Sequence, residues 1–103
     1  MNTTAQNRSI DARVHRAIDD LLRERLGPYG FRSARVMPGV DHDGDPVLFI
    51  DAEYDLSDVP VNSRETLDTL VDLRRKLSEL GEERFPHIRH HFADKQKVVG
   101  FKK

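Results

Sequence analysis

The dipeptide Asp43-Gly44 constrains this chain more than any other feature, because it lies between two stretches in which polar and apolar residues alternate. These stretches cover residues 31–40 and 47–56. Alternation with a period of two is typical of a β-strand with one buried face. Asp-Gly between two strands favours a two-residue type I′ turn, since both central residues of that turn need positive φ. We therefore predict a β-hairpin that turns at Asp43-Gly44, with a longer loop as the alternative.

The turn also predicts which face of the hairpin is buried. A two-residue turn places Arg32 directly opposite Asp55. One face is then mostly apolar and is expected to pack against helices. It consists of Phe31, Ser33, Arg35, Met37, Leu48, Ile50, Ala52, Tyr54 and Leu56. The opposite face carries the carboxylates of Asp51, Glu53 and Asp55, and nothing in the sequence identifies the group that they face.

A first amphipathic helix is predicted before the hairpin. Its apolar residues recur at helical spacing and leave one side polar. They are Ile10, Val14, Ala17, Ile18 and Leu21. Ser9 is a suitable N-cap, and Gly27-Pro28 is expected to end the helix after Leu26.

A second helix is predicted after the hairpin, starting at Asn62 or Ser63. Asn62 and Glu65 have the spacing of a capping box, with Asn in place of Ser or Thr. Gly81 is a natural C-terminal stop. The helix has a broad apolar face made of Leu67, Leu70, Val71, Leu73, Leu77 and Leu80.

A third strand is expected after the second helix, because Ile88, His90 and Phe92 alternate with polar residues. The stretch 98–101 fits a short strand, a docked tail or an arm that reaches a neighbour. The order is helix, strand, strand, helix, strand, which predicts an α+β fold with two helices on one face of a small, mainly antiparallel sheet. Residues 1–8 are expected to form a disordered leader, and residues 9–103 a single α+β domain with a basic C-terminal segment.

This order of elements resembles the cytoplasmic domain of cation diffusion facilitators and, more loosely, KH-like modules. The resemblance is one of topology. The chain has neither a GxxG loop of the KH kind nor a transporter motif, so the resemblance implies a fold and no site residue.

Composition points to a small core. Of 103 residues, 37% are hydrophobic and 34% are charged, against roughly 45–50% apolar and about 25% charged in an average globular domain. A core of this kind is often completed by a partner, so we expect a homodimer or a protein partner. The chain has no cysteine, which excludes disulfides and thiolate chemistry. We expect a cytoplasmic protein with no membrane span, since no secretion signal or long apolar run is present.

Charge is distributed unevenly along the chain. Residues 36–63 contain seven acids and no Lys or Arg, whereas residues 84–103 contain six basic residues and one acid. Runs of this kind are often ordinary solvated surface. Alternatively, the acidic hairpin and the basic end meet, within the fold or between two copies. The acidic residues are Asp41, Asp43, Asp45, Asp51, Glu53, Asp55 and Asp58, and the basic residues are Arg84, Arg89, Lys95, Lys97, Lys102 and Lys103.

The function predicted from these patterns is a non-catalytic module for self-association or protein binding. We predict no cofactor and no catalytic residue, because no known catalytic motif is present. The residues expected to bind the partner are Asp51, Glu53, Asp55, Arg89, Lys95 and Lys97. Two other hypotheses remain. His87 and His91 share one face of the third strand and are the pair expected to bind a metal ion, in a metal-binding protein or small metal-dependent enzyme. The basic segment, with its aromatic residues, is a less favoured candidate for binding nucleic acid.

Overall fold

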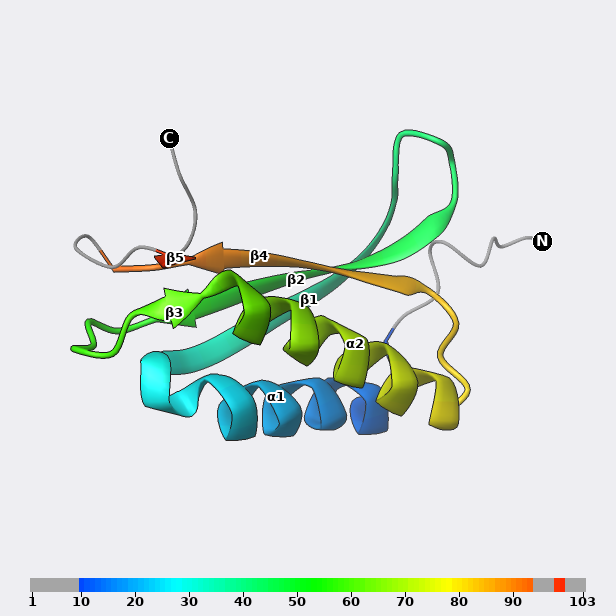
Figure 1. Ribbon diagram of the computed structural model, residues 1–103. Helices are drawn as coiled ribbons and strands as arrows, with labels where there is room; N and C mark the ends of the chain where they lie inside the picture. The colour runs from blue at the N-terminus through cyan, green and yellow to red at the C-terminus, as the bar shows by residue number, and fades with distance from the viewer. Residues whose placement is uncertain (1–9, 94–97, 100–103) are drawn as a thin grey trace.

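The computed structural model describes residues 10–93 and 98–99, which form two layers (Figure 1). One layer is a three-stranded sheet and the other consists of two helices that lie on the same face of it. This arrangement confirms the predicted α+β class and the order of the elements. The main elements are α1 (Ala12–Leu26), β1 (Phe31–Val40), β2 (Pro46–Tyr54), α2 (Ser63–Glu79) and β4 (Phe85–His91).

The sheet is mixed. Its strand order is β1-β2-β4, in which β1 pairs with β2 antiparallel and β4 pairs with β2 parallel. Parallel neighbours need a crossover connection, and α2 supplies it between β2 and β4. Three short elements complete the fold: the 3-10 turn η2 (Gly27–Tyr29), β3 (Val61–Asn62) and β5 (Val98–Val99).

Of the stretch 98–101, residues 98 and 99 form the short strand β5, which pairs with β3 in parallel. Residues 100 and 101 lie outside the described residues. The expected leader, residues 1–8, lies outside the described residues, as do Lys95 and Lys97.

The hairpin turn is longer than the two-residue turn predicted. Residues 41–45 form the loop, and the side chain of Asp41 accepts hydrogen bonds from the backbone N–H groups of Asp43 and Asp45, both at 2.9 Å. Only Gly44 has positive φ in this loop, at +88°. A type I′ turn requires positive φ at Asp43 as well, so the carboxylate of Asp41 organises a wider turn instead.

The wider loop shifts the strand register by one residue, which corrects the predicted faces of β1. Arg35 lies opposite Asp51, and Val36 lies opposite Ile50. Because side chains alternate along a strand, Ser33, Arg35 and Met37 are on the face away from the helices, contrary to prediction. The residues of β1 that pack against the core are instead Ala34 and Val36.

Phe31 nevertheless faces the core as predicted, because the register is irregular between Phe31 and Ser33. The extra residue, Arg32, restores the alternation for Phe31, whose ring meets Tyr54 edge to face. Arg32 and Asp55 do approach each other, at 3.7 Å, but both side chains are exposed. Leu56 was expected on the buried face and is instead 65% exposed, since β2 ends before it.

The core lies between the sheet and the helices. Its fully or almost fully buried members come from both layers and include Ile18, Leu22, Leu26, Leu48, Ile50, Ala52, Leu73 and Leu77. The apolar face of α2 is narrower than predicted, since Leu67 and Val71 are 59% and 50% exposed.

The helix ends follow local chemistry. The N-cap of α1 is Asp11, which accepts a hydrogen bond from the N–H of Arg13, whereas the predicted cap, Ser9, lies outside the described residues. The predicted cap of α2 is confirmed, because Asn62 Oδ1 accepts the N–H of Glu65 at 2.7 Å. The carboxylate of Glu65, which a capping box would direct back to Asn62, instead accepts a hydrogen bond from Arg25 of α1 at 3.4 Å.

Candidate functional site

The candidate site is the side of the sheet that faces away from both helices, which we call the outer face. In Figure 1 it is the upper side of the sheet, and no helix lies over it. Alternate residues of the three strands project from it. They are Ser33, Arg35, Met37 and Gly39 of β1, Val47, Phe49, Asp51 and Glu53 of β2, and Phe85, His87, Arg89 and His91 of β4.

Asp51 is the centre of a charged cluster on this face. Arg89 donates two hydrogen bonds to its two carboxylate oxygens, at 2.9 and 3.1 Å, and His91 Nε2 lies 2.8 Å from Oδ1. The side chain of Asp51 is only 9% exposed, whereas that of Arg89 is 51% exposed. The hydrogen bonds from His91 and Arg89 lower the pKa of Asp51, so the carboxylate stays ionised beneath its partners.

This cluster corrects the expectation that the three carboxylates face no identifiable group. Asp51 is neutralised within the fold, because the parallel pairing of β2 and β4 sets it beside Arg89. Glu53 has no ion pair among the described residues. Asp55 follows the end of β2, and its carboxylate lies 3.7 Å from Arg32. The predicted binding residues Asp51, Glu53 and Arg89 therefore lie together, Asp55 lies beyond the strand end, and Lys95 and Lys97 are outside the described part of the chain.

The end of the outer face nearer the hairpin loop is apolar and aromatic. The ring of Phe49 lies across Gly39, where an added Cβ would come within 2.5 Å of the ring. The guanidinium of Arg89 lies over the same ring, 4.8 Å from its centroid. The rings of Phe49 and His87 are 5.7 Å apart. Met37, on β1 beside Phe49, is 43% exposed.

Arg35, Met37 and Phe49 are site residues that the sequence prediction did not include. The predicted register, which is wrong by one residue, places Arg35 and Met37 on the buried face, and Phe49 is absent from the predicted binding residues. The alternation of β2 could have identified Phe49, because it is two residues from Asp51 and must therefore lie on the same face of the strand. Arg35 has no ion pair among the residues that the structure describes.

The histidines are divided between the two faces, as the alternation predicted. His87 and His91 share the outer face, yet four residues of extended strand separate them by about 13 Å, whereas the ligands of one zinc ion lie about 2 Å from the metal. Within residues 10–93 and 98–99, no group of three or more His, Asp or Glu side chains is arranged to hold a metal ion. The geometry gives no support to a shared metal site, and the metal hypothesis stays a prediction.

His90 lies on the inner side and contacts Tyr54, with 2.7 Å between Nδ1 and the phenol oxygen. Burial lowers the pKa of His90, with a smaller effect from His91, and burial raises the pKa of Tyr54. Both shifts favour the neutral forms, so we infer that the phenol donates to a neutral imidazole. This hydrogen bond lies on the helix side of the sheet and joins the two groups to each other.

Comparisons with known proteins provide no identity. No protein-family model, curated protein or solved structure matches this chain. Among the described residues, neither helix has the length and apolar character needed to cross a membrane.

Proposed function

We propose that this chain is a non-catalytic interaction module that forms a homodimer through its outer face. The observation that carries the proposal is the composition of that face. Its apolar end, where Val47 is buried, Phe49 is half-buried and Met37 is 43% exposed, lies beside a charged end, and Figure 1 shows neither α1 nor α2 over it. A sheet with one solvated face usually shows polar residues there, so the partly exposed side chains of Phe49 and Met37 favour burial against a partner. The cytoplasmic location expected from the sequence belongs to the same proposal.

A second copy is the favoured partner because the charge pattern along the sheet is self-complementary. Rows of side chains follow one another at about 7 Å in the order Val47, Phe49, Asp51 along β2, and Asp45 of the hairpin loop precedes them. A two-fold axis between the Val47 and Phe49 rows would set the apolar ends of two copies against each other. The same axis sets the row of Asp51 against the hairpin loop of the second copy.

These two regions carry opposite charge. The Asp51 row includes Arg35 and Arg89, and the loop includes the exposed carboxylates of Asp43 and Asp45. Asp51 is already neutralised by its partners, so the row presents a net positive charge to the loop. Complementary charges of this kind orient partners and speed their encounter.

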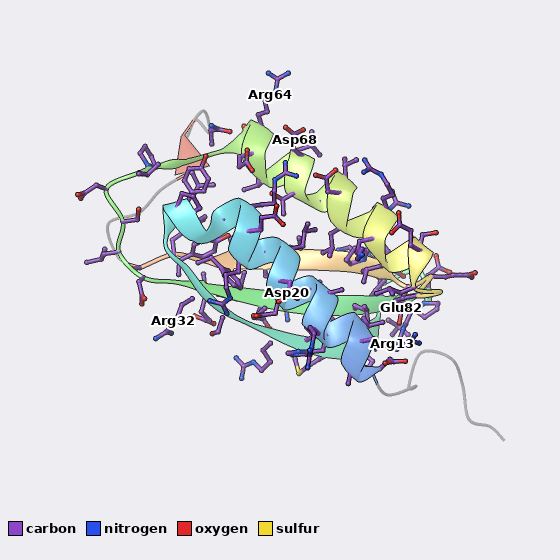
Figure 2. All side chains as sticks on the ribbon, turned by 90° about the horizontal axis from the view of Figure 1, so that it is seen from below. Arg13, Asp20, Arg32, Arg64, Asp68 and Glu82 are labelled. Carbon is purple, nitrogen blue, oxygen red and sulfur yellow. The ribbon has the colours of Figure 1, made fainter. Side chains whose placement is uncertain are left out.

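Measuring molar mass in solution tests the proposal. The wild-type chain should be a dimer that weakens at high salt, because exposed charges are screened. Arg35→Glu and the pair Asp43→Lys with Asp45→Lys should each give monomers. An equimolar mixture of these two variants should restore dimers, since each interface then joins opposite charges. The matched control is Arg64→Glu on α2, which Figure 2 shows projecting from the helix layer.

The proposal fails if the wild-type chain is a monomer at low salt and at the highest concentration it tolerates. It also fails if the dimer survives both charge reversals. Recovery of dimers in the mixture is the decisive result. If either variant were monomeric because its own fold was damaged, adding the other variant would not restore a dimer.

A further inference from the structure

We propose that the free edge of β1 binds an extended, acidic segment of a partner protein as an additional strand. This surface is distinct from the outer face, since it consists of backbone groups at the margin of the sheet. The sheet order places β1 at an edge, and none of the described residues pairs with its outer side.

The hydrogen bonds of the hairpin show which backbone groups face that edge. Asp41 N–H donates to the carbonyl oxygen of Asp45 at 3.0 Å, so these two residues are a hydrogen-bonded pair. Hydrogen-bonded and non-bonded pairs alternate in an antiparallel ladder. Residues 33, 35, 37 and 39 therefore bond to β2, and Ala34, Val36 and Pro38 face the edge.

Proline at this position agrees with that assignment, because Pro38 has no N–H and is tolerated only where none is needed. Ala34 and Val36 each offer one N–H and one C=O to an incoming strand. Beyond them, Pro38 offers a carbonyl alone, which limits the pairing at that end. The Arg32 carbonyl at the other end already accepts a bond from Arg23, at 3.3 Å. The part of the β1 edge that can pair fully is therefore short, because Pro38 limits it at one end and the bonded carbonyl of Arg32 limits it at the other.

A groove between α1 and β1 runs beside this edge. It is lined by Ile10, Ala12, His15 and Arg16 from the helix side and by Ser33 and Ala34 from the strand. Figure 2 shows α1 lying along the β1 side of the sheet. An added strand would place alternate side chains into this groove, where small apolar residues fit beside Ala12 and Ala34, and the others on the outer side next to Arg35.

Charge identifies the class of partner. β1 contains no acid and two cations: Arg32, which lies 3.7 Å from Asp55, and Arg35, which has no ion pair among the described residues. Pairing β1 with β1 of a second copy would bring like charges together, which is a common protection of natural edge strands. An acidic strand would instead meet the cation of Arg35. Of the described residues, two carboxylates line the groove, and one of them, Asp19, is already paired with Arg23 at 3.1 Å. Asp20 is the other carboxylate of the groove. It belongs to α1 and does not lie on the outer face, where Arg35 projects.

The test uses a fluorescent octapeptide of alternating Glu and Val as the probe, with a Lys-Val peptide of the same pattern as its control. Anisotropy should show binding of the Glu-Val peptide and at least about tenfold weaker binding of the Lys-Val peptide, a difference of roughly 1.4 kcal/mol. Val36→Pro removes a free N–H and should weaken binding by a similar factor. Arg64→Glu should leave it unchanged.

Two further measurements keep the result interpretable. If Val36→Pro fails to fold, the wild-type chain is tested with a Glu-Val peptide methylated at alternate backbone nitrogens, which should not bind in the pairing register. The chain with Asp43→Lys and Asp45→Lys, a monomer under the dimer proposal, should still bind the peptide, at least as tightly as wild type, because its changes lie in the hairpin loop and leave the edge of β1 and Arg35 free. Failure of the dimer and failure of the edge site are therefore distinguishable. Equal binding of the two peptides, or full binding of the methylated one, overturns the edge proposal.

Discussion

Asp51 of β2 and Arg89 of β4 are 38 residues apart in sequence, and their side chains meet through two hydrogen bonds of 2.9 and 3.1 Å. His91 adds a third contact to the same carboxylate. A buried carboxylate is stable only when such partners replace its lost hydration. The acidic run and the basic end, which look independent along the chain, therefore meet at this position within one copy.

Replacing Asp51 by Asn should destabilise the protein by about 1–3 kcal/mol at pH 7, the usual range for hydrogen bonds to charged groups. The pKa of Asp51 is lowered by folding, so its contribution is present above the unfolded pKa of about 3.9 and is lost as pH falls through the folded value. Urea unfolding at neutral and acidic pH should show the two chains converging in acid. Asp55→Asn, at an exposed pair, is the control and should change stability by less than about 1 kcal/mol. Equal losses in both variants would contradict this account.

His90 should also make stability fall as pH is lowered, but in a range closer to neutrality. Its pKa is lowered by burial, so the neutral form is the folded form. The contribution is complete above the unfolded pKa of about 6.5 and is lost as pH falls below it. His90→Leu should therefore flatten the stability profile between about pH 7 and pH 5 relative to wild type. His42→Leu, at a side chain that is 94% exposed, should leave the profile unchanged.

Gly39 is predicted to be intolerant of a side chain. An alanine Cβ would lie 2.5 Å from Phe49, so the ring must leave its place, and we expect a loss of about 1–3 kcal/mol in thermal or urea unfolding. Gly27→Ala provides the comparison, since no atom lies within 4 Å of its added Cβ. That variant should be neutral or slightly stabilising. If both alanines behave alike, the contact between Gly39 and Phe49 has no energetic role.

The cap of α2 should be measurable in isolation. Asn62→Ala removes the acceptor for the Glu65 N–H and should cost about 1 kcal/mol. Ser63→Ala alters the neighbouring exposed residue without removing the cap, and its unfolding free energy should stay near that of wild type. A loss confined to Ser63→Ala would mean that the helix start is assigned to the wrong residue.

The sequence by itself determined the elements and their order, because these depend on short-range chemistry. Residue spacing was enough for the helices and for the strands of the hairpin, and Asn62 and Gly81 were enough for the limits of α2. Local signals were insufficient where two acceptable choices lay side by side. Ser9 and Asp11 are both good caps, and Asp43-Gly44 suits a two-residue turn as well as a wider loop closed by Asp41.

Only the tertiary structure decided the register and the partners of the charged groups. The longer loop shifted the register by one residue and so moved Arg35 and Met37 from the expected core to the outer face, since side chains alternate with a period of two. Likewise, Leu67 and Val71 belong to an apolar pattern but are exposed, because the sheet covers a narrower stripe of α2 than the pattern spans. The contact of Asp51 with Arg89 depends on a crossover through α2, and parallel pairing between strands so far apart leaves no mark in local spacing.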